Sequence, residues 1–192
     1  MGITQQRIGE WGQFANAGGI RRLKLLAETD VLAVLDPVQF PNALPFPTLA
    51  AANLIVPPGA TIYEFCFANG TCGLTVGHTE TENGDAFELV IGFEVPKLRA
   101  DVLAWIVRHL GRRWVVILQD FNGTNYLAGD VQTPLELTTT QSSGNRPADR
   151  NVIRFQLRGR QTHPAWLLES FENADLFPDA DWGYEFDLSF TS

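Results

Sequence analysis

The stretch Trp114–Gly129, which reads WVVILQDFNGTNYLAG, decides the fold class. Its first part, Trp114–Gln119, is the densely apolar run expected of a β-strand. Asp120–Thr124 then holds an Asn-Gly pair, which favours a tight turn, and Tyr126–Gly129 runs back. The stretch therefore predicts a β-hairpin within a mainly β protein.

Further strand patterns lie on both sides of this hairpin. Downstream, Leu135–Thr140 is rich in Thr, which suits a pleated surface, and Asn151–Arg158 alternates apolar and polar residues. Upstream, Thr61–Ala68 and Thr71–Thr79 flank Asn69-Gly70 and predict a second hairpin. The remaining strands are expected at Ile20–Glu28, Val31–Asp36 and Ala86–Glu94.

One helix is expected, at about residues 97–110. Pro96 suits its first turn, Asp101 lies near its positive end, and Gly111 is a natural C-terminal stop. Apolar residues form a stripe along it, made by Leu98, Val102, Leu103, Ile106, Val107 and Leu110. The stripe predicts that this single helix flanks the sheet.

The chain of 192 residues is long enough for one domain with a core, or for a domain with arms. Residues 1–19 are polar and contain glycine, with isolated apolar residues such as Trp11 and Phe14, and predict an N-terminal arm. Residues 20–192 predict a single β-rich domain.

Residues 37–60 differ from the rest of this domain. They hold six prolines, which remove hydrogen-bond donors and so argue against a central strand. The segment is also apolar, with Phe40, Leu44, Phe46 and Leu49 among its residues. We expect an extended loop, which either folds over the domain's own core or docks on a neighbouring subunit.

The charge of the chain is concentrated at its end. The net charge is −8, and residues 161–192 hold no Lys or Arg. Their acidic residues are Glu169, Glu172, Asp175, Asp179, Asp181, Glu185 and Asp187. Such a balance disfavours nucleic-acid binding, which needs cationic side chains. Alternating apolar residues from Trp182 to Phe190 predict that this end is a strand with one apolar face.

Arginines gather around the strand at 151–158, because Arg146, Arg150, Arg154, Arg158 and Arg160 lie in or beside it. Arginine pairs with carboxylates in planar geometry and is enriched at interfaces. The acidic C-terminal segment, with Asp181 and Asp187, offers partners within one chain or between subunits. A phosphate-binding stripe is the competing interpretation.

Cys66 and Cys72 flank the Asn69-Gly70 turn. A two-residue turn would place their sulfurs on opposite faces, whereas a three-residue loop would permit a disulfide. The start of the chain lacks the apolar core of a signal peptide, and no stretch of about 18 apolar residues exists. We therefore expect synthesis in a host cytoplasm, no membrane partner, and buried reduced thiols.

No pattern of residues indicates an enzyme, a metal site or a cofactor. The three histidines have no zinc-like spacing, and no nucleophile elbow or phosphate-binding loop appears. A hydrolase using Glu80, Glu82 or Asp120 is the least favoured alternative. A carbohydrate-binding β-sandwich that uses Trp11, Trp166 or Trp182 is another.

The order of the pieces resembles that of small virion proteins of tailed phages and prophages, particularly those of Bacteroidetes hosts. Gly19–Leu23 leads through strands to Asp36-Pro37, and Val95-Pro96-Lys97 opens the helix. The phrases WVVILQDFNG at 114–123, LAG at 127–129 and PLEL at 134–137 follow. This layout is similar to the tail-tube fold, a β-sandwich or barrel flanked by one helix.

The resemblance implies a structural protein of the virion tail, for which we expect stacked hexameric rings with DNA passing through the lumen without specific binding. It also implies contacts with other tail or connector proteins. A head–tail joining or tail-terminator protein, which forms a single ring, is the alternative. The candidate self-assembly residues are Trp11, Phe14, Phe40, Leu44, Phe46, Leu49, Arg154, Arg158, Asp181 and Asp187.

Overall fold

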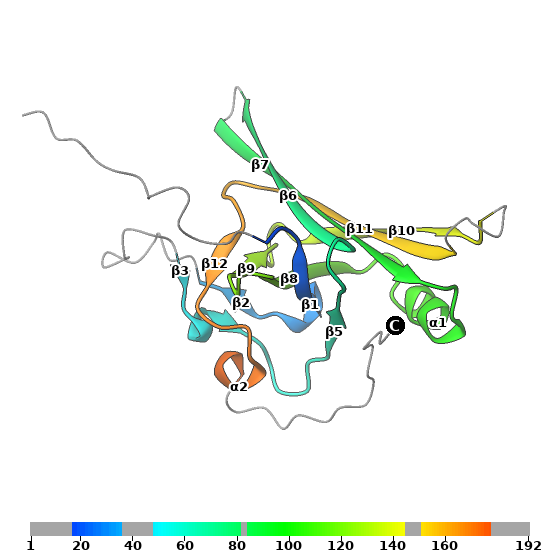
Figure 1. Cartoon of the computed structure of the whole chain (residues 1–192). Helices are drawn as coiled ribbons and strands as arrows, with labels where there is room; N and C mark the ends of the chain where they lie inside the picture. The colour runs from blue at the N-terminus through cyan, green and yellow to red at the C-terminus, as the bar shows by residue number, and fades with distance from the viewer. Residues whose placement is uncertain (1–16, 36–47, 82–83, 145–150, 178–192) are drawn as a thin grey trace, which may run out of the picture.

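The computed structural model describes residues 17–35, 48–81, 84–144 and 151–177, over which the protein is mainly β (Figure 1). The strands are β1 (Ile20–Ala27), β2 (Ala33–Val34), β3 (Thr48–Leu49), β4 (Leu54–Ile55), β5 (Ile62–Cys66), β6 (Cys72–Thr81), β7 (Gly84–Pro96), β8 (Arg113–Asp120), β9 (Asn125–Ala128), β10 (Leu135–Ser142), β11 (Val152–Gln161) and β12 (Trp166–Leu168). The helices are α1 (Ala100–Arg108), α2 (Asn173–Leu176) and the 3-10 turns η1 (Glu28–Asp30) and η3 (Ala51–Asn53). Within these ranges no helix is long and apolar enough to cross a membrane.

Ten strands form one sheet that folds into two layers, so the expected sandwich-like class is confirmed (Figure 1). The first layer has the order β5-β1-β8-β9-β12-β3, and the second has the order β10-β11-β7-β6. Strands β2 and β4 form a separate two-stranded sheet. The helix expected at 97–110 is α1, and the short α2 was not expected.

The two layers meet at a corner where β8 and β10 pair through Trp114 with Leu135 and Arg113 with Glu136. Two glycines allow the close approach of the chains at this corner. A Cβ atom on Gly159 would lie 2.4 Å from the Leu135 side chain, and one on Gly129 would lie 3.0 Å from the Trp114 carbonyl oxygen. Gly129 also has a φ of +83°, which other residues rarely adopt.

Strand β8 is buried on both faces, since Trp114, Val115, Val116, Ile117 and Leu118 are all fully buried. Successive side chains of a strand point to opposite faces. Trp114, Val116 and Leu118 therefore belong to a first core between the layers, and Val115 and Ile117 to a second core behind the first layer. The apolar run that decides the fold class thus requires two cores.

Helix α1 packs against one end of the first core through Val102, Trp105 and Ile106. Its buried face is rotated from the predicted stripe, because Val107 and Leu110 are 68% and 70% exposed. Large aromatic contacts decide this rotation: the Trp105 ring lies 5.6 Å from that of Trp114 and stacks on it.

Helix α1 begins later in the chain than predicted. Pro96 is the last residue of β7 rather than part of the first helical turn, and Lys97 follows with a φ of +66°. The helix begins only at Ala100. Gly111, with a φ of +74°, lies just past the helix as expected.

The second core is built from segments far from β8 in sequence. Leu49 and Leu54 come from the proline-rich region, and Trp166, Phe171 and Leu176 come from the C-terminal part. The region 37–60 is therefore not one extended loop, because its residues 48–55 form β3, η3 and β4 and cover the first layer. Leu49 is fully buried there.

The predicted hairpin between Thr61–Ala68 and Thr71–Thr79 is wrong, although both strands exist. Strand β5 pairs with β1, and β6 pairs with β7, so the Asn69-Gly70 turn connects the two layers. Gly70 does have the positive φ of a turn residue, +81°. The predicted turn at Asn69-Gly70 is therefore confirmed, whereas the pairing partner of each strand depends on the two cores.

The two cysteines are consequently not cross-strand partners. Cys66 lies opposite Arg22 on β1, and Cys72 lies opposite Phe93 on β7. Cys72 is buried as expected, and this burial raises the pKa of its thiol to about 12. Cys66 is exposed, contrary to expectation.

A fully buried lysine fastens the C-terminal part of the described chain to β1. Lys24 Nζ donates hydrogen bonds to the Phe171 carbonyl and, at 2.6 Å, to Oδ1 of Asn173, and it lies 4.1 Å from the centre of the Phe171 ring. Burial lowers the pKa of Lys24 to about 8. Hydrogen bonds and the Phe171 ring therefore hold the Lys24 ammonium in place, although burial destabilises its charged form.

This cost predicts a pH dependence of stability. The pKa of Lys24 is about 8 in the folded state and 10.5 in the unfolded state, so between these values the unfolded chain binds the extra proton and stability rises with pH. Relative to a Lys24→Met variant, the free energy of unfolding of the wild type should gain on the order of 2–3 kcal/mol over this window. Urea denaturation across the pH range measures this gain. The exposed Lys97→Met variant is the control, and parallel curves for wild type and Lys24→Met would contradict the prediction.

Candidate functional site

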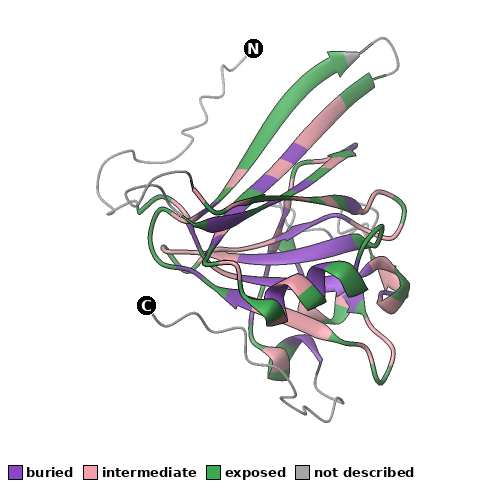
Figure 2. Ribbon diagram, turned by 90° about the vertical axis from the view of Figure 1, so that its right-hand side faces the viewer, coloured by how far each residue is buried: buried purple, intermediate pink, exposed green. Residues whose placement is uncertain are grey.

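The outer face of the second layer stands out because no described segment covers it, whereas the first layer is buried on both sides (Figure 2). On β11, Ile153, Phe155 and Leu157 point into the first core, and the residues between them are exposed. The strand registers define the outer face as Gly73, Thr75, Gly77, Thr79, Ala86, Glu88, Val90, Gly92, Glu94, Glu136, Thr138, Thr140, Arg154, Gln156, Arg158 and Arg160.

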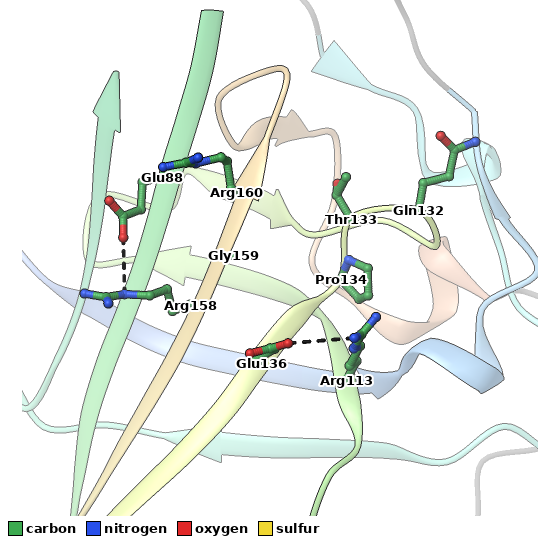
Figure 3. A pocket seen from close by; sticks show the side chains of 9 residues that line it. All are labelled: Glu88, Arg113, Gln132, Thr133, Pro134, Glu136, Arg158, Gly159 and Arg160. Atoms are coloured by element: carbon green, nitrogen blue, oxygen red, sulfur yellow. Dashed lines mark ion pairs between the residues drawn. The ribbon is translucent and has the colours of Figure 1, made fainter. Parts of the chain in front are cut away.

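The charges of the outer face balance one another. Arg154 Nε lies 2.8 Å from Glu94 Oε1, and Arg158 Nε lies 3.3 Å from Glu88 Oε1. At the corner, Arg113 Nη2 lies 3.8 Å from Glu136 Oε1 (Figure 3). The face holds three arginines and three glutamates, so it carries no net charge.

Two shallow hollows mark the outer face. In one, Gly73 and Gly92 lie directly opposite each other, and a Cβ atom on either would meet no atom within 4 Å. The other lies beside the β8–β10 corner, and Figure 3 shows Glu88, Arg113, Glu136, Arg158 and Arg160 around it. Backbone and short polar side chains form much of the first hollow, which suits contact with an extended surface.

Asp130 shapes the loop that borders the second hollow. Its Oδ1 accepts hydrogen bonds from the backbone N–H groups of Gln132, at 2.7 Å, and Thr133. The pKa of Asp130 is lowered to about 2, first by the interaction with His163 and then by these backbone bonds. Its partners are those of a turn-stabilising carboxylate rather than of a catalytic base.

Both edges of the second layer carry strands with an open side over most of their length. Strand β6 has ten residues and pairs only with β7 among the described strands. Strand β10 pairs with β11, and on its other side it meets β8 only at Leu135 and Glu136. Protected edges commonly carry Lys or Pro, and β6 contains neither. Each edge therefore presents backbone groups that can pair with another strand.

The β6–β7 hairpin projects beyond the rest of the sheet, as Figure 2 shows. Strand β11 stops pairing with β7 at Phe87, whereas β6 and β7 continue to pair up to Thr81 and Gly84. A projecting, solvent-exposed hairpin adds no core contact of its own within the described residues. It extends the reach of the β6 edge.

The structure places the sequence candidates for self-assembly in different environments. Trp11, Phe14, Phe40, Leu44, Phe46, Asp181 and Asp187 lie outside the described residues. Leu49 is fully buried in the second core, so it supports the chain's own fold. Arg154 and Arg158 lie together on the outer face and are exposed.

The acidic partners of Arg154 and Arg158 were missed by the sequence analysis. These partners, Glu94 and Glu88, come from β7. Both acids lie in the strand expected at Ala86–Glu94, on the same face, but the pairing of that strand with β11 could not be derived from either sequence segment. The C-terminal acids were more conspicuous, and of these Glu172 pairs with Arg22 at 2.8 Å.

Two of the residues considered for other chemistry, Asp120 and Trp166, have structural roles. Asp120 Oδ1 accepts the N–H groups of Asn122 at 2.9 Å and Thr124 at 2.8 Å, which confirms the predicted turn. Trp166 is buried in the second core, so its ring is not available to stack on a sugar. Glu80 lies on the projecting hairpin, and Glu82, Trp11 and Trp182 are outside the described residues.

The histidines are scattered over the described part of the chain, where no group of three or more metal-ligating side chains gathers. His109 is buried at the C-terminal end of α1, with Nε2 2.9 Å from the Tyr63 hydroxyl and Nδ1 2.6 Å from the Trp105 carbonyl oxygen. Burial is the largest cause that lowers the pKa of His109, which keeps it neutral as a core residue.

Comparison of the chain with protein-family models, curated proteins and solved structures gives no match. Function is therefore inferred from the chemistry of the outer face and from the two open edges.

If the outer face makes no contacts that stabilise the fold, truncating a residue of β11 on that face should change the free energy of unfolding much less than truncating its neighbour on the inner face. Arg154→Ala or Arg158→Ala should change the free energy of unfolding by less than about 1 kcal/mol, because their ion pairs are exposed to water. Phe155→Ala should cost about 3–5 kcal/mol, because it opens a cavity in the first core. Urea denaturation of the three variants tests this, and an equal cost at Arg154 and Phe155 would disprove it.

Proposed function

We propose that the protein is a structural subunit that assembles with copies of itself into rings, and that stacked rings form the tube of a phage tail. The supporting observation is a four-stranded sheet that has an apolar inner face, a polar outer face and an open side at both edge strands of the described chain. In the described residues, no group of three or more metal-ligating side chains gathers on this face.

In the proposed ring, the β6 edge of one copy pairs with the β10 edge of the next. Two different edges make a head-to-tail interface. Such an interface closes into a ring when the rotation that relates neighbouring copies is a full turn divided by an integer. Closure removes every open edge of the sheet, as in a barrel. The resemblance in layout described above favours a hexameric ring.

The outer faces of the joined sheets would line the lumen. Each of Arg154 and Arg158 already has a glutamate partner within the chain, so the lining offers few unpaired cations to phosphate groups. Binding of DNA to a protein depends strongly on the number of phosphates that cations neutralise. A balanced lining therefore lets DNA pass without being held.

Negative-stain electron microscopy, combined with the mass in solution at several protein concentrations, tests the proposal. Tubes with a central hole support a tail-tube subunit. Single rings that do not stack would instead identify a tail-terminator or head–tail joining protein. A monomer at every concentration, including with tail-initiator proteins present, would contradict self-assembly.

Charge on the β6 edge should abolish assembly. Thr75→Lys together with Thr79→Lys places two cations beside the open edge, and such charges oppose strand addition. The double variant should remain folded but monomeric by mass and microscopy. Gln156→Lys, on the same face but on the internal strand β11, is the control and should still form rings. Normal rings from the double variant would exclude the β6 edge as the interface.

Removing the acidic partners should convert the outer face into a DNA-binding surface. The wild type should bind duplex DNA negligibly, whereas Glu88→Gln, Glu94→Gln and Glu136→Gln combined leave three arginines unbalanced. DNA affinity should then fall with salt, with a log–log slope of about −3. Fluorescence anisotropy with labelled DNA measures the slope. Glu28→Gln, Glu80→Gln and Glu169→Gln combined make the same charge change elsewhere, and equal binding by this control would contradict the proposal.

A further inference from the structure

The inner face of the projecting hairpin becomes acidic toward its turn. On β6, Val76, His78 and Glu80 lie on this face, and the strand register places Phe87 opposite His78 and Asp85 opposite Glu80. Val76 is 40% exposed, and Glu80 is exposed and makes no ion pair with a described residue. Asp85 Oδ1 lies 3.1 Å from His78 Nε2. The hairpin therefore presents an apolar part near the sheet and two carboxylates beyond it.

The opposite end of the second layer is cationic. Strand β7 runs from this hairpin toward α1, so its 13 residues separate the two ends by about 40 Å (Figure 1). Val107, Arg108, Leu110 and Arg112, called the helix end below, are all exposed, and they lie in the last turn of α1 and just after it. Arg108 and Arg112 make no ion pair with a described residue.

The two arginines of the helix end lie near each other. Burial is the largest cause that lowers the pKa of His109, and the charges of Arg112 and Arg108 lower it further, so both guanidinium groups lie close to this one side chain. The apolar residues between and beside them, Leu110 and Val107, are 70% and 68% exposed. A partner for the helix end should therefore combine apolar and acidic side chains, as the projecting hairpin does.

We propose that the inner face of the projecting hairpin of one copy packs on the helix end of a second copy in the next ring. This inference rests on the proposed ring and assigns the contact through which rings stack. Glu80 and Asp85 would face Arg108 and Arg112, and Val76 would pack on the apolar residues of the helix end.

The positions of the two surfaces require a second copy. They lie at opposite ends of β7, so they cannot meet within one chain. A contact between two different surfaces is head-to-tail, and it repeats from copy to copy as an open stack when the copies do not close into a ring. Edge pairing joins copies at right angles to the strands, whereas this contact joins them along the strands. Both contacts can therefore exist in one assembly.

Another exposed apolar patch of the described chain fits the acidic hairpin less well. Leu32, Leu35 and Ile55 are exposed around β2 and β4. The acidic Glu28 and Asp30 of η1 precede them in sequence, and like charges repel. The helix end offers arginines where this patch offers acids.

A charge exchange between the two surfaces tests the contact. Arg108→Glu with Arg112→Glu should lower the fraction of rings found in stacks by at least about tenfold, because four carboxyl groups would then face one another. Rings should persist, since neither edge strand is changed. Adding Glu80→Gln and Asp85→Lys to this variant should restore stacking. The lysine is placed on β7 so that the β6 edge gains no cation. Negative-stain microscopy counts single rings and stacks.

Arg21→Glu with Arg160→Glu is the matched control. Both arginines are exposed, and their replacement makes the same change in net charge away from the helix end, so stacks should remain. Stacks that persist in the Arg108 and Arg112 variant would overturn the inference and leave the ring intact. Failure of the charge exchange to restore stacking would also overturn it. A wild type that forms no rings would instead contradict the proposed function, and this inference with it.

Crosslinking tests the same contact without relying on charge. In a Cys66→Ser background, Asp85→Cys with Arg112→Cys and a short bis-maleimide should give a ladder of covalent multimers. Either cysteine alone should give no ladder, because each copy would then carry one of the two reacting surfaces. Cys72 is buried, so it does not compete for the reagent. Rings without a ladder would overturn the inference.

Discussion

The burial of β8 on both faces is the constraint on which the rest of the structure depends. Five consecutive buried side chains, Trp114–Leu118, need apolar partners on two sides of one strand. The second layer supplies partners on one side. On the other side they come from distant segments that contribute Leu49, Trp166 and Phe171. Since these segments are used to cover the first layer, the outer face of the second layer is the broad sheet surface that the described chain leaves open.

The corner between the layers determines how the two layers separate from each other. Strands β8 and β10 share only two residue pairs before β10 leaves with β11 into the second layer. Gly129 and Gly159 allow the backbone to pass close to Trp114 and Leu135, where a larger residue would collide. The second layer is therefore closed at one end of β10 and open along most of its remaining length. An edge of this kind can accept a strand without disturbing either core.

Much of this fold could be predicted from sequence, because strand and helix patterns are local. The turn at Asp120–Thr124, the strand at 151–158 and the helix stop at Gly111 all depend on neighbouring residues. Pairing partners do not, and the wrong hairpin across Asn69-Gly70 shows why. That turn has hairpin chemistry, but β5 joins β1 in the opposite layer, where Phe65 is buried in the first core. The ion pairs of Arg154 and Arg158 were missed for the same reason.

Lys24 shows how a polar group defines a position that apolar contacts leave open. A methionine at this site would fill a similar volume, but burial of apolar surface is not directional and would not select one placement of residues 170–177. The ammonium must instead meet the Phe171 carbonyl and the Asn173 side chain, and its lowered pKa records what that burial costs. Arg22 adds a second attachment through Glu172. Together these contacts hold Phe171, Glu172 and Asn173 against β1, so polar groups of one strand of the first layer determine where this part of the chain lies.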